Sequence, residues 1–200
     1  EELELFHTPS YIEKLIRLSA KGSGSLDCGD TPAFPGIYES ACVVAGCVLD
    51  GARRIIDGKA NRAFIPIAGL HHARRNTAAG FCAINDIGII IEELRSNHNI
   101  RRIAYVDIDA HHGDGVYYEY ENDAEVFIAD IHEDGNYLYP GTGFRSETGK
   151  EKAIGTKLNL PLTPPRVHNE DFFPAWNEIE SFLATAQPEF IILQAGADSI

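Results

Sequence analysis

The apolar residues of this chain recur at two spacings, which separate helical from extended segments. Apolar positions three or four residues apart form one face of an amphipathic helix. Thr8-Pro9 is a typical N-cap and first-turn pair, and Asn169-Glu170-Asp171 is expected to cap a later helix and complement its dipole. The pattern predicts four helices: from Pro9 to the Gly/Ser stretch at 21–25, from Ile37 to Ile56 with Gly58 as its stop, around Ile87 to Leu94, and around Phe172 to Leu183.

Short apolar runs rich in β-branched residues lie between these helices. Their near-continuous apolarity, without alternation, is typical of strands buried on both faces, as in parallel sheets covered by helices. We therefore expect an α/β fold with three layers, a mostly parallel sheet with helices on both faces. The predicted strands are Ala63–Ile67, Ile103–Val106, Val126–Ile128 and Phe190–Leu193. No repeat or linker-like run divides residues 1–200, so we expect a single domain.

Composition narrows the class of protein. With 44% apolar and 24% charged residues, the 200-residue chain has the balance of a globular domain. Its 17 basic and 30 acidic residues give a net charge of −13, which disfavours nucleic acid and favours cationic partners. No apolar run is long enough to span a bilayer, and the four cysteines show neither zinc-knuckle spacing nor disulfide density. These features predict a cytoplasmic protein without a membrane partner.

Polar and ionisable residues follow three of the predicted strands. His71-His72 comes shortly after the run Ala63–Ile67, and the segment from Asp107 to Gly115 follows Ile103–Val106. The segment Gln194-Ala195-Gly196-Ala197-Asp198 follows Phe190–Leu193. In open parallel sheets the ligand crevice lies beyond the carboxyl ends of the strands. These three segments are therefore where we expect the chemistry.

The segment after Val106 contains a potential metal site. If it stays extended, Asp107, Asp109 and His111 point to one side, because side chains alternate along a strand. Asp109 and His111 supply two ligands for a divalent cation and Asp198 a third, which leaves positions open for water and substrate, as in catalytic sites.

A base must still remove the proton from a metal-activated water. His71 or His72 suits this role, provided that a carboxylate fixes the ring tautomer, and Asp107 and Asp114 are available for that.

A plainer interpretation is that these residues only cap helices and form turns. Each of them alone is more typical of a cap or turn, and Gly113-Asp114-Gly115 by itself reads as a tight turn. Together, however, they would place costly charge near a buried sheet unless a cation offset it. His7, His98 and His168 are assigned no role.

Five segments together resemble the histone deacetylase family, in particular its prokaryotic members, including the acetoin-utilisation type. They are Gly69–Ala73, Gly80–Asp86, Val106–Gly115, Tyr139–Gly143 and Gln194–Ser199, in the family's order along nearly the whole chain. The resemblance implies the arginase/deacetylase α/β fold and a zinc-dependent amide hydrolase, with Fe²⁺ as a substitute. It implies an acetylated lysine peptide or protein, or an acetylated polyamine, as the substrate.

The resemblance also implies roles for single residues. Asp109, His111 and Asp198 would be zinc ligands. His71 and His72 would be the tandem catalytic histidines, with Asp107 behind His71, Asp114 behind His72, and His72 as the general base.

Four further residues match positions that contact substrate in the family. Phe81 would form one wall of a tunnel around the acyl-lysine stem, and Tyr139 the opposite wall, where many relatives have Phe. Gly80 would offer its carbonyl to the substrate amide, and Asp30 would match the carboxylate at the rim that orients the substrate backbone.

An inner K⁺ or Na⁺ site is implied as well. It would use the backbone oxygens of Asp107 and His111 and the side chain of Asp109, near Asp130 and Ile131. Asp130 occupies the position where the family usually has a small hydroxyl residue, which changes the charge around this ion.

Family catalytic domains are longer than this chain. The resemblance implies that the chain lacks an N-terminal strand and a C-terminal Gly-rich loop, whose tyrosine hydrogen-bonds the substrate carbonyl. Little or no activity is therefore expected of the 200-residue segment alone. Two alternatives stay open: a binuclear manganese ureohydrolase of the arginase type, and a non-catalytic module that binds acyl-lysine.

Overall fold

The structure is a computed structural model that describes residues 2–164 and 168–199. The chain forms two compact units, Glu1–Asn99 and Ile100–Ile200. The first is built from helices and long connections, and the second contains the sheet. None of the described helices is long and apolar enough to cross a membrane. The prediction of a single domain is not tested by this division and stays a prediction.

Helices and their caps define the first unit. It contains the short 3-10 helix η1 (Glu2–Leu5) and helices α1 (Pro9–Lys21), α2 (Ile37–Ile56) and α3 (Asp86–His98). As predicted, Thr8 caps α1, and its side chain accepts from the backbone N–H of Tyr11. The side chain of Asn85 caps α3 in the same way, accepting from Gly88 N at 2.8 Å.

The core of this unit lies where α2 packs against α1 and α3, with η1 beside all three helices. Leu15, Leu49 and Ile91 are fully buried there. Gly88 lets α3 approach η1, because a Cβ at this position would lie 2.7 Å from Cγ of Phe6. The three helices predicted in this part of the chain therefore form.

The predicted strand at 63–67 does not form. Among the described residues of this unit only isolated bridges occur, so the apolar run has no neighbouring strand to pair with. Phe64 and Ile67 are 84% and 52% exposed. A short apolar run indicates a buried strand only where a neighbouring strand supplies backbone partners, and the prediction was wrong for this reason.

The second unit is built on a four-stranded parallel sheet. Its strands are β1 (Ile103–Asp107), β2 (Val126–Glu133), β3 (Lys157–Leu162) and β4 (Phe190–Gln194), in the order β3-β2-β1-β4. Asp107 at the end of β1 is in register with Asp130 of β2 and with Gln194 of β4. Three of these strands are predicted by their apolar runs, whereas β3 is not.

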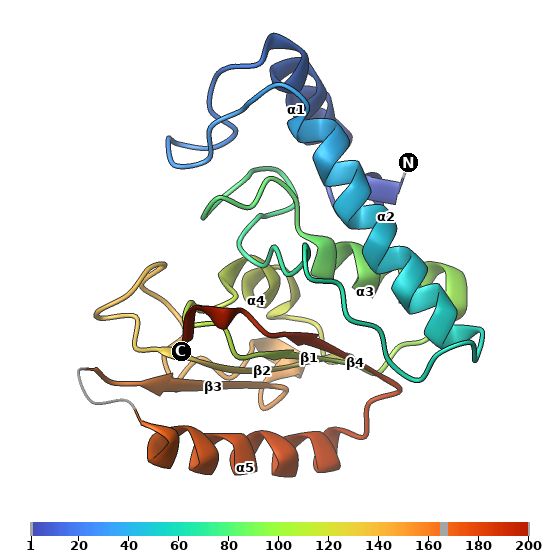
Figure 1. The fold of residues 1–200 in the computed structure, drawn as a ribbon. Coiled ribbons are helices and arrows are strands. Elements are labelled where there is room, and N and C mark those ends of the chain that lie inside the picture. Colours follow the sequence, from blue (N-terminus) through green and yellow to red (C-terminus); the bar gives the residue numbers. More distant parts are fainter. Residues whose placement is uncertain (1, 165–167, 200) are drawn as a thin grey trace. The chain divides into compact units, whose positions relative to one another are not determined.

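Two helices lie on opposite faces of this sheet, α4 (Asp114–Tyr120) and α5 (Asn169–Ala186) (Figure 1). The chain moves one way across the sheet from β1 to β2 and the other way from β3 to β4, so right-handed crossovers place the two helices on different faces. α5 buries Val106, Ala129 and Leu160. The predicted α/β class with a helix-covered parallel sheet is confirmed.

One local prediction needs correction. Helix α4 has no counterpart among the four predicted helices. The cap of α5 is His168 rather than Asn169, and the side chain of Asp171 accepts from His168 N at 2.9 Å, so His168 has a structural role.

Candidate active site

The candidate site of the second unit lies where the sheet changes its direction of winding. β1 and β4 are neighbours, but the connections that follow and precede them cross opposite faces. Such a switch point leaves a crevice at the carboxyl ends of the two strands. Asp109 and His111 follow β1, and Asp198 lies in the short 3-10 helix η3 (Ala197–Ser199) after β4.

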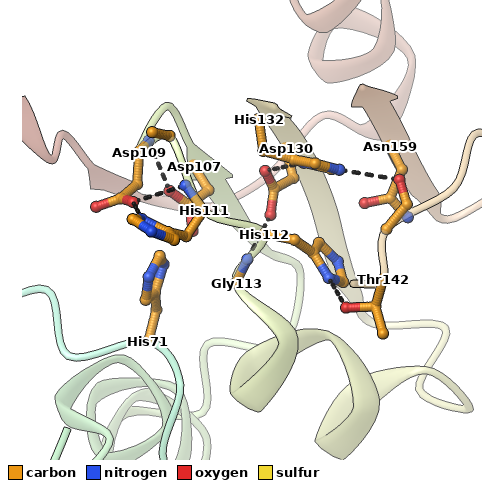
Figure 2. A network of polar contacts seen from close by, with 12 residues as sticks. His71, Asp107, Asp109, His111, His112, Gly113, Asp130, His132, Thr142 and Asn159 are labelled. Carbon is orange, nitrogen blue, oxygen red and sulfur yellow. Dashed lines mark hydrogen bonds and ion pairs between the residues drawn. The ribbon is translucent and has the colours of Figure 1, made fainter. Parts of the chain in front are cut away.

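Asp109, His111 and Asp198 converge at this point. Their candidate ligand atoms all lie within 4.8 Å of one another. His111 Nδ1 is 3.0 Å from Asp109 Oδ1 and 3.0 Å from Asp198 Oδ2. Asp109 is buried, His111 is partly exposed and Asp198 is exposed. Figure 2 shows the imidazole of His111 against Asp109.

Hydrogen bonds from the surrounding backbone hold the two carboxylates of the cluster in place. Asp109 Oδ1 accepts from His111 N at 2.8 Å, and Asp198 Oδ1 accepts from Ala110 N at 3.0 Å. Gly196 leaves room for the cluster, because a Cβ there would lie 2.7 Å from Cγ of Asp109. Two carboxylates and one imidazole nitrogen form a donor set that suits Zn²⁺ at an open, catalytic type of site. The residues present therefore fit the metal that the resemblance implies.

Gln194 belongs to one of the segments where the chemistry is expected, but no role was predicted for its side chain. Its Nε2 donates to Asp109 Oδ2 at 2.9 Å, and its Oε1 accepts from Gly196 N at 2.7 Å. The side chain thereby joins Asp109 to the turn that leads to Asp198. Its amide at the end of an apolar strand was the available signal.

The segment after β1 does not stay extended. The strand ends at Asp107, whose carboxylate accepts from Asp109 N at 3.0 Å and from the hydroxyl of Tyr105. Burial, together with the charge of Asp107, raises the pKa of Tyr105, so this hydroxyl stays protonated. Asp107 is consequently not part of the three-residue cluster, and the expected convergence of Asp107, Asp109 and His111 on one side is wrong for Asp107.

Asp130 and His132 form a second polar group, fully buried in β2 (Figure 2). Asp130 Oδ1 lies 2.6 Å from His132 Nδ1, and Asp130 Oδ2 accepts from Gly113 N at 2.9 Å. Burial raises the pKa of Asp130 to about 6, whereas the His132 charge lowers it. Burial alone would lower the pKa of His132, but Asp130 and the carbonyl of Gly143 raise it above its ordinary value.

The cation site expected near Asp107, Asp109, His111, Asp130 and Ile131 stays a prediction. The Asp130 side chain contacts Gly113 N through Oδ2 and His132 Nδ1 through Oδ1.

The tandem histidines lie in the first unit. His71 and His72 are buried, with their Nε2 atoms 3.1 Å apart, close enough for one ring to donate to the other. Asp86, also buried, accepts from Gly69 N and Leu70 N just before them. Asn85 Nδ2 donates to the carbonyl of Ala73 at 2.9 Å, just after them. Asn85 and Asp86 thus fix the histidine segment to the start of α3.

A tight turn lies against His72. Cys82 N donates to the carbonyl of Ala79 at 2.8 Å, and Gly80 and Phe81 both have positive φ, as in a type I′ turn. A Cβ at Gly80 would lie 2.8 Å from Cγ of His72, so only glycine fits. The turn leaves the ring of Phe81 78% exposed.

The remaining predicted residues lie on loops. Asp30 is exposed in the first unit and accepts from its neighbour Thr31 Oγ1, and a hydrogen bond with Asp27 raises its pKa. Tyr139, in the second unit, is 44% exposed, and its ring centroid lies 6.4 Å from that of His111. Asp114 is buried as the first residue of α4. The pairings of Asp107 with His71, of Asp114 with His72 and of Phe81 with Tyr139 join different units and stay predictions.

A comparison with known protein families decides the relationship of the chain. The model of the histone deacetylase domain matches residues 1–200. The chain belongs to the histone deacetylase family.

Curated members of the histone deacetylase family show the same relationship. The acetoin utilization protein AcuC of Bacillus subtilis (strain 168) is 37% identical over 208 residues, covering the whole of this chain and 53% of that protein. Histone deacetylase 8 of Xenopus laevis is 34% identical over 207 residues, covering the whole chain and 63% of that protein. The chain thus spans about half to two thirds of the length of these relatives. The predicted family, with its acetoin-utilisation type, is confirmed.

Solved structures of histone deacetylase homologues have the same fold. A crystal structure of such a homologue in complex with SAHA superimposes with a TM-score of 0.86 at 31% identity, over 96% of this chain and 53% of that chain. The homologue from Aquifex aeolicus gives a TM-score of 0.85 at 32% identity. The arginase/deacetylase type of α/β fold expected from the sequence is therefore confirmed.

Proposed function

We propose that the protein containing this chain is a metal-dependent deacetylase, which hydrolyses the amide of acetyl-lysine or of a related acetylated amine. The observation that carries the proposal is the convergence of Asp109, His111 and Asp198 at the switch point of the sheet. Its membership in the histone deacetylase family supports the same reaction. Among the described residues, Asp109, His111 and Asp198 form one three-residue candidate ligand group, which suits a mononuclear deacetylase better than a binuclear ureohydrolase.

Asp109, His111 and Asp198 would hold Zn²⁺, or Fe²⁺ in its place. When bound, the ion supplies a Lewis acid for the substrate carbonyl and acidifies a water molecule. Gln194 fixes the orientation of Asp109, so that one carboxylate oxygen keeps its direction toward the site.

His72 acts as the general base in this mechanism. It takes the proton of the attacking water and returns a proton to the leaving amine. His71, whose ring contacts that of His72, adjusts the charge on the pair. Asp107 and Asp114 hold the two imidazoles in the required tautomer. Phe81 and Tyr139 flank the aliphatic stem of the acylated side chain, the Gly80 carbonyl accepts from its amide, and Asp30 orients its backbone.

The charge of the chain suits a cationic substrate. A net charge of −13 raises the local concentration of basic acetylated peptides or polyamines and disfavours nucleic acid. The free thiols of all four cysteines support a cytoplasmic location. A K⁺ or Na⁺ ion near Asp107 would offset part of the buried negative charge.

Replacement of the proposed base tests this function in the full-length, metal-loaded protein. We expect His72→Ala to reduce kcat for an acetyl-lysine peptide by about 100-fold or more, because a general base contributes this much, while the metal content stays at one ion per chain. Peptide hydrolysis is followed by mass spectrometry and metal content by elemental analysis.

His98→Ala is the matched control, since His98 lies at the end of α3 and has no role in the mechanism. It should retain the wild-type rate. Equal rates in His72→Ala and wild type would refute the base assignment, and a wild-type protein that binds the peptide without hydrolysing it would identify a non-catalytic binding module.

A further inference from the structure

The connection from Asp134 to Thr156 carries Tyr139 to the metal-ligand cluster. The Tyr139 ring meets that of His111 edge to face and is partly exposed. A molecule that reaches the cluster from solvent therefore has this ring beside it. What holds Tyr139 there determines the shape of the entrance.

The connection is anchored at Gly143, four residues after Tyr139. The Gly143 carbonyl accepts from His132 Nε2 at 2.9 Å, and its N–H donates to Glu147 Oε1 at 2.9 Å. Next to it, Thr142 Oγ1 lies 2.8 Å from His112 Nδ1. Gly143 has φ of +84°, and a Cβ there would lie 2.7 Å from His112 Cγ, so this backbone lies directly against the imidazoles.

The anchor continues through His132 into the sheet. Both ring nitrogens of His132 face acceptors, Asp130 Oδ1 and the Gly143 carbonyl, so the ring donates from both sides. Asp130 in turn accepts from Gly113 N, at the head of α4. Asp130 and His132 are fully buried, and Figure 2 shows them between Gly113 and the loop. Removing one partner of a buried ion pair is costly, because it leaves the other charge buried without its counter-charge.

We propose that the Asp130–His132 pair is a positioning device that holds Tyr139 at the entrance and thereby sets the affinity for the acylated amine. This inference rests on the proposed function. Asp130 is central to it, since one carboxylate bridges Gly113 and His132. A hydroxyl side chain at this position is shorter, has one oxygen instead of two and carries no charge to pair with His132.

Two variants of Asp130, studied in the full-length, metal-loaded protein, test the device. Asp130→Asn removes the charge, and Asp130→Ser removes the contact with His132 but provides a hydroxyl for a monovalent cation. Both should accelerate hydrogen exchange about tenfold or more in peptides spanning 139–147, with no change in α5. Both should also raise the Kd of an acetyl-lysine peptide about three- to tenfold, measured in the His72→Ala background so that no turnover is needed.

A double-mutant cycle connects the pair to Tyr139. Because the pair acts through this ring, Asp130→Asn should raise the Kd no further in a Tyr139→Ala background. Glu189→Gln is the matched control: Glu189 is a carboxylate that accepts from Arg101 N and Arg102 N at the opposite end of the strands, and its replacement should change neither measurement.

Several results would overturn the inference. One is an Asp130→Ser variant with the hydrogen exchange and the peptide Kd of wild type, even if Asp130→Asn differs from wild type. Another is hydrogen exchange that rises uniformly over the chain. The others are additive effects of Asp130→Asn and Tyr139→Ala on the Kd, and no measurable binding of the peptide to wild type. If the Asp130 variants do not fold, Asp130→Asn/His132→Gln removes both charges together and gives the same test. A peptide that binds but is not hydrolysed defeats the proposed function and leaves this inference intact.

Discussion

Gly80 is in such close contact with His72 that one added carbon would displace the imidazole. Gly80→Ala should therefore lower kcat of deacetylation by about 100-fold, the usual cost of moving a catalytic group by about 1 Å. Gly58→Ala is the matched control, because Gly58 has a similar positive φ but open space around its Cβ position. Both changes should cost about 1–2 kcal/mol in stability from the left-handed backbone, as measured by urea unfolding. Equal activities in the two variants would contradict the proposed position of His72.

Single residues differ in how far the sequence reveals them. Asp109, His111 and Asp198 were predicted to gather, and they do, because ionisable residues at strand ends meet at one edge of a parallel sheet. The role of Gln194 was not predicted, because its amide is uncharged and is not a typical metal ligand. Asp130 was noticed only as a departure from the family, since its partner His132 is recognisable as a partner only when the strand register is known.

At the scale of elements, α2 contains two glycines in different surroundings. Gly46 has open space around its Cβ position, so Gly46→Ala should raise the free energy of unfolding by about 0.5–1 kcal/mol. Gly51 faces the segment 63–65, and a Cβ there would lie 3.0 Å from Ile65 Cδ1. Gly51→Ala should therefore gain nothing or lose stability. Urea denaturation of both variants checks this, and an equal gain at the two sites would show that residues 63–65 do not pack on α2 as described.

Helices were predicted more reliably than strands, for a physical reason. Their signals are local: apolar spacing, a cap such as Thr8 and a stop such as Gly22 all lie within the element. Strand pairing is not local, so the apolar run 63–67 was mistaken for a strand. β3 was not predicted, because Lys157 and Pro161 interrupt its apolar pattern. β2 was predicted to end at Ile128, because Asp130 and His132 are polar residues typical of loops. They fit in a buried strand because they pair with each other.

At the scale of the whole molecule, His7 should make stability depend on pH. It is buried, and its Nε2 accepts from Asn85 N at 2.9 Å, a bond that requires the neutral ring. Burial lowers the pKa of His7 from 6.5 to about 4, with minor contributions from its neighbours. Because the unfolded chain binds this proton more tightly, His7 stabilises the fold above pH 6.5, and this contribution is lost as the pH falls toward 4. The loss amounts to about 3 kcal/mol.

His7→Gln isolates this effect, since the amide oxygen can accept from Asn85 N and does not titrate. The difference in unfolding free energy between wild type and His7→Gln, measured by denaturant titration from pH 7 to pH 4, should change by about 3 kcal/mol in favour of the variant. A difference that stays constant over this range would mean that His7 can be protonated in the folded state.

Lys157, at the first residue of β3, has a different consequence for the molecule. Its ammonium group is buried and donates to the carbonyls of Asp123 and Val126 and to Thr156 Oγ1. Reagents that acetylate lysine reach the exposed amines of Lys21, Lys59 and Lys152 directly, but they reach Lys157 only after this edge of the sheet opens. In a member of a family named for removing acetyl groups, an acetyl mark on Lys157 would therefore record a transient unfolding event at β3, whereas marks on Lys21, Lys59 and Lys152 would record only the exposure of these amines.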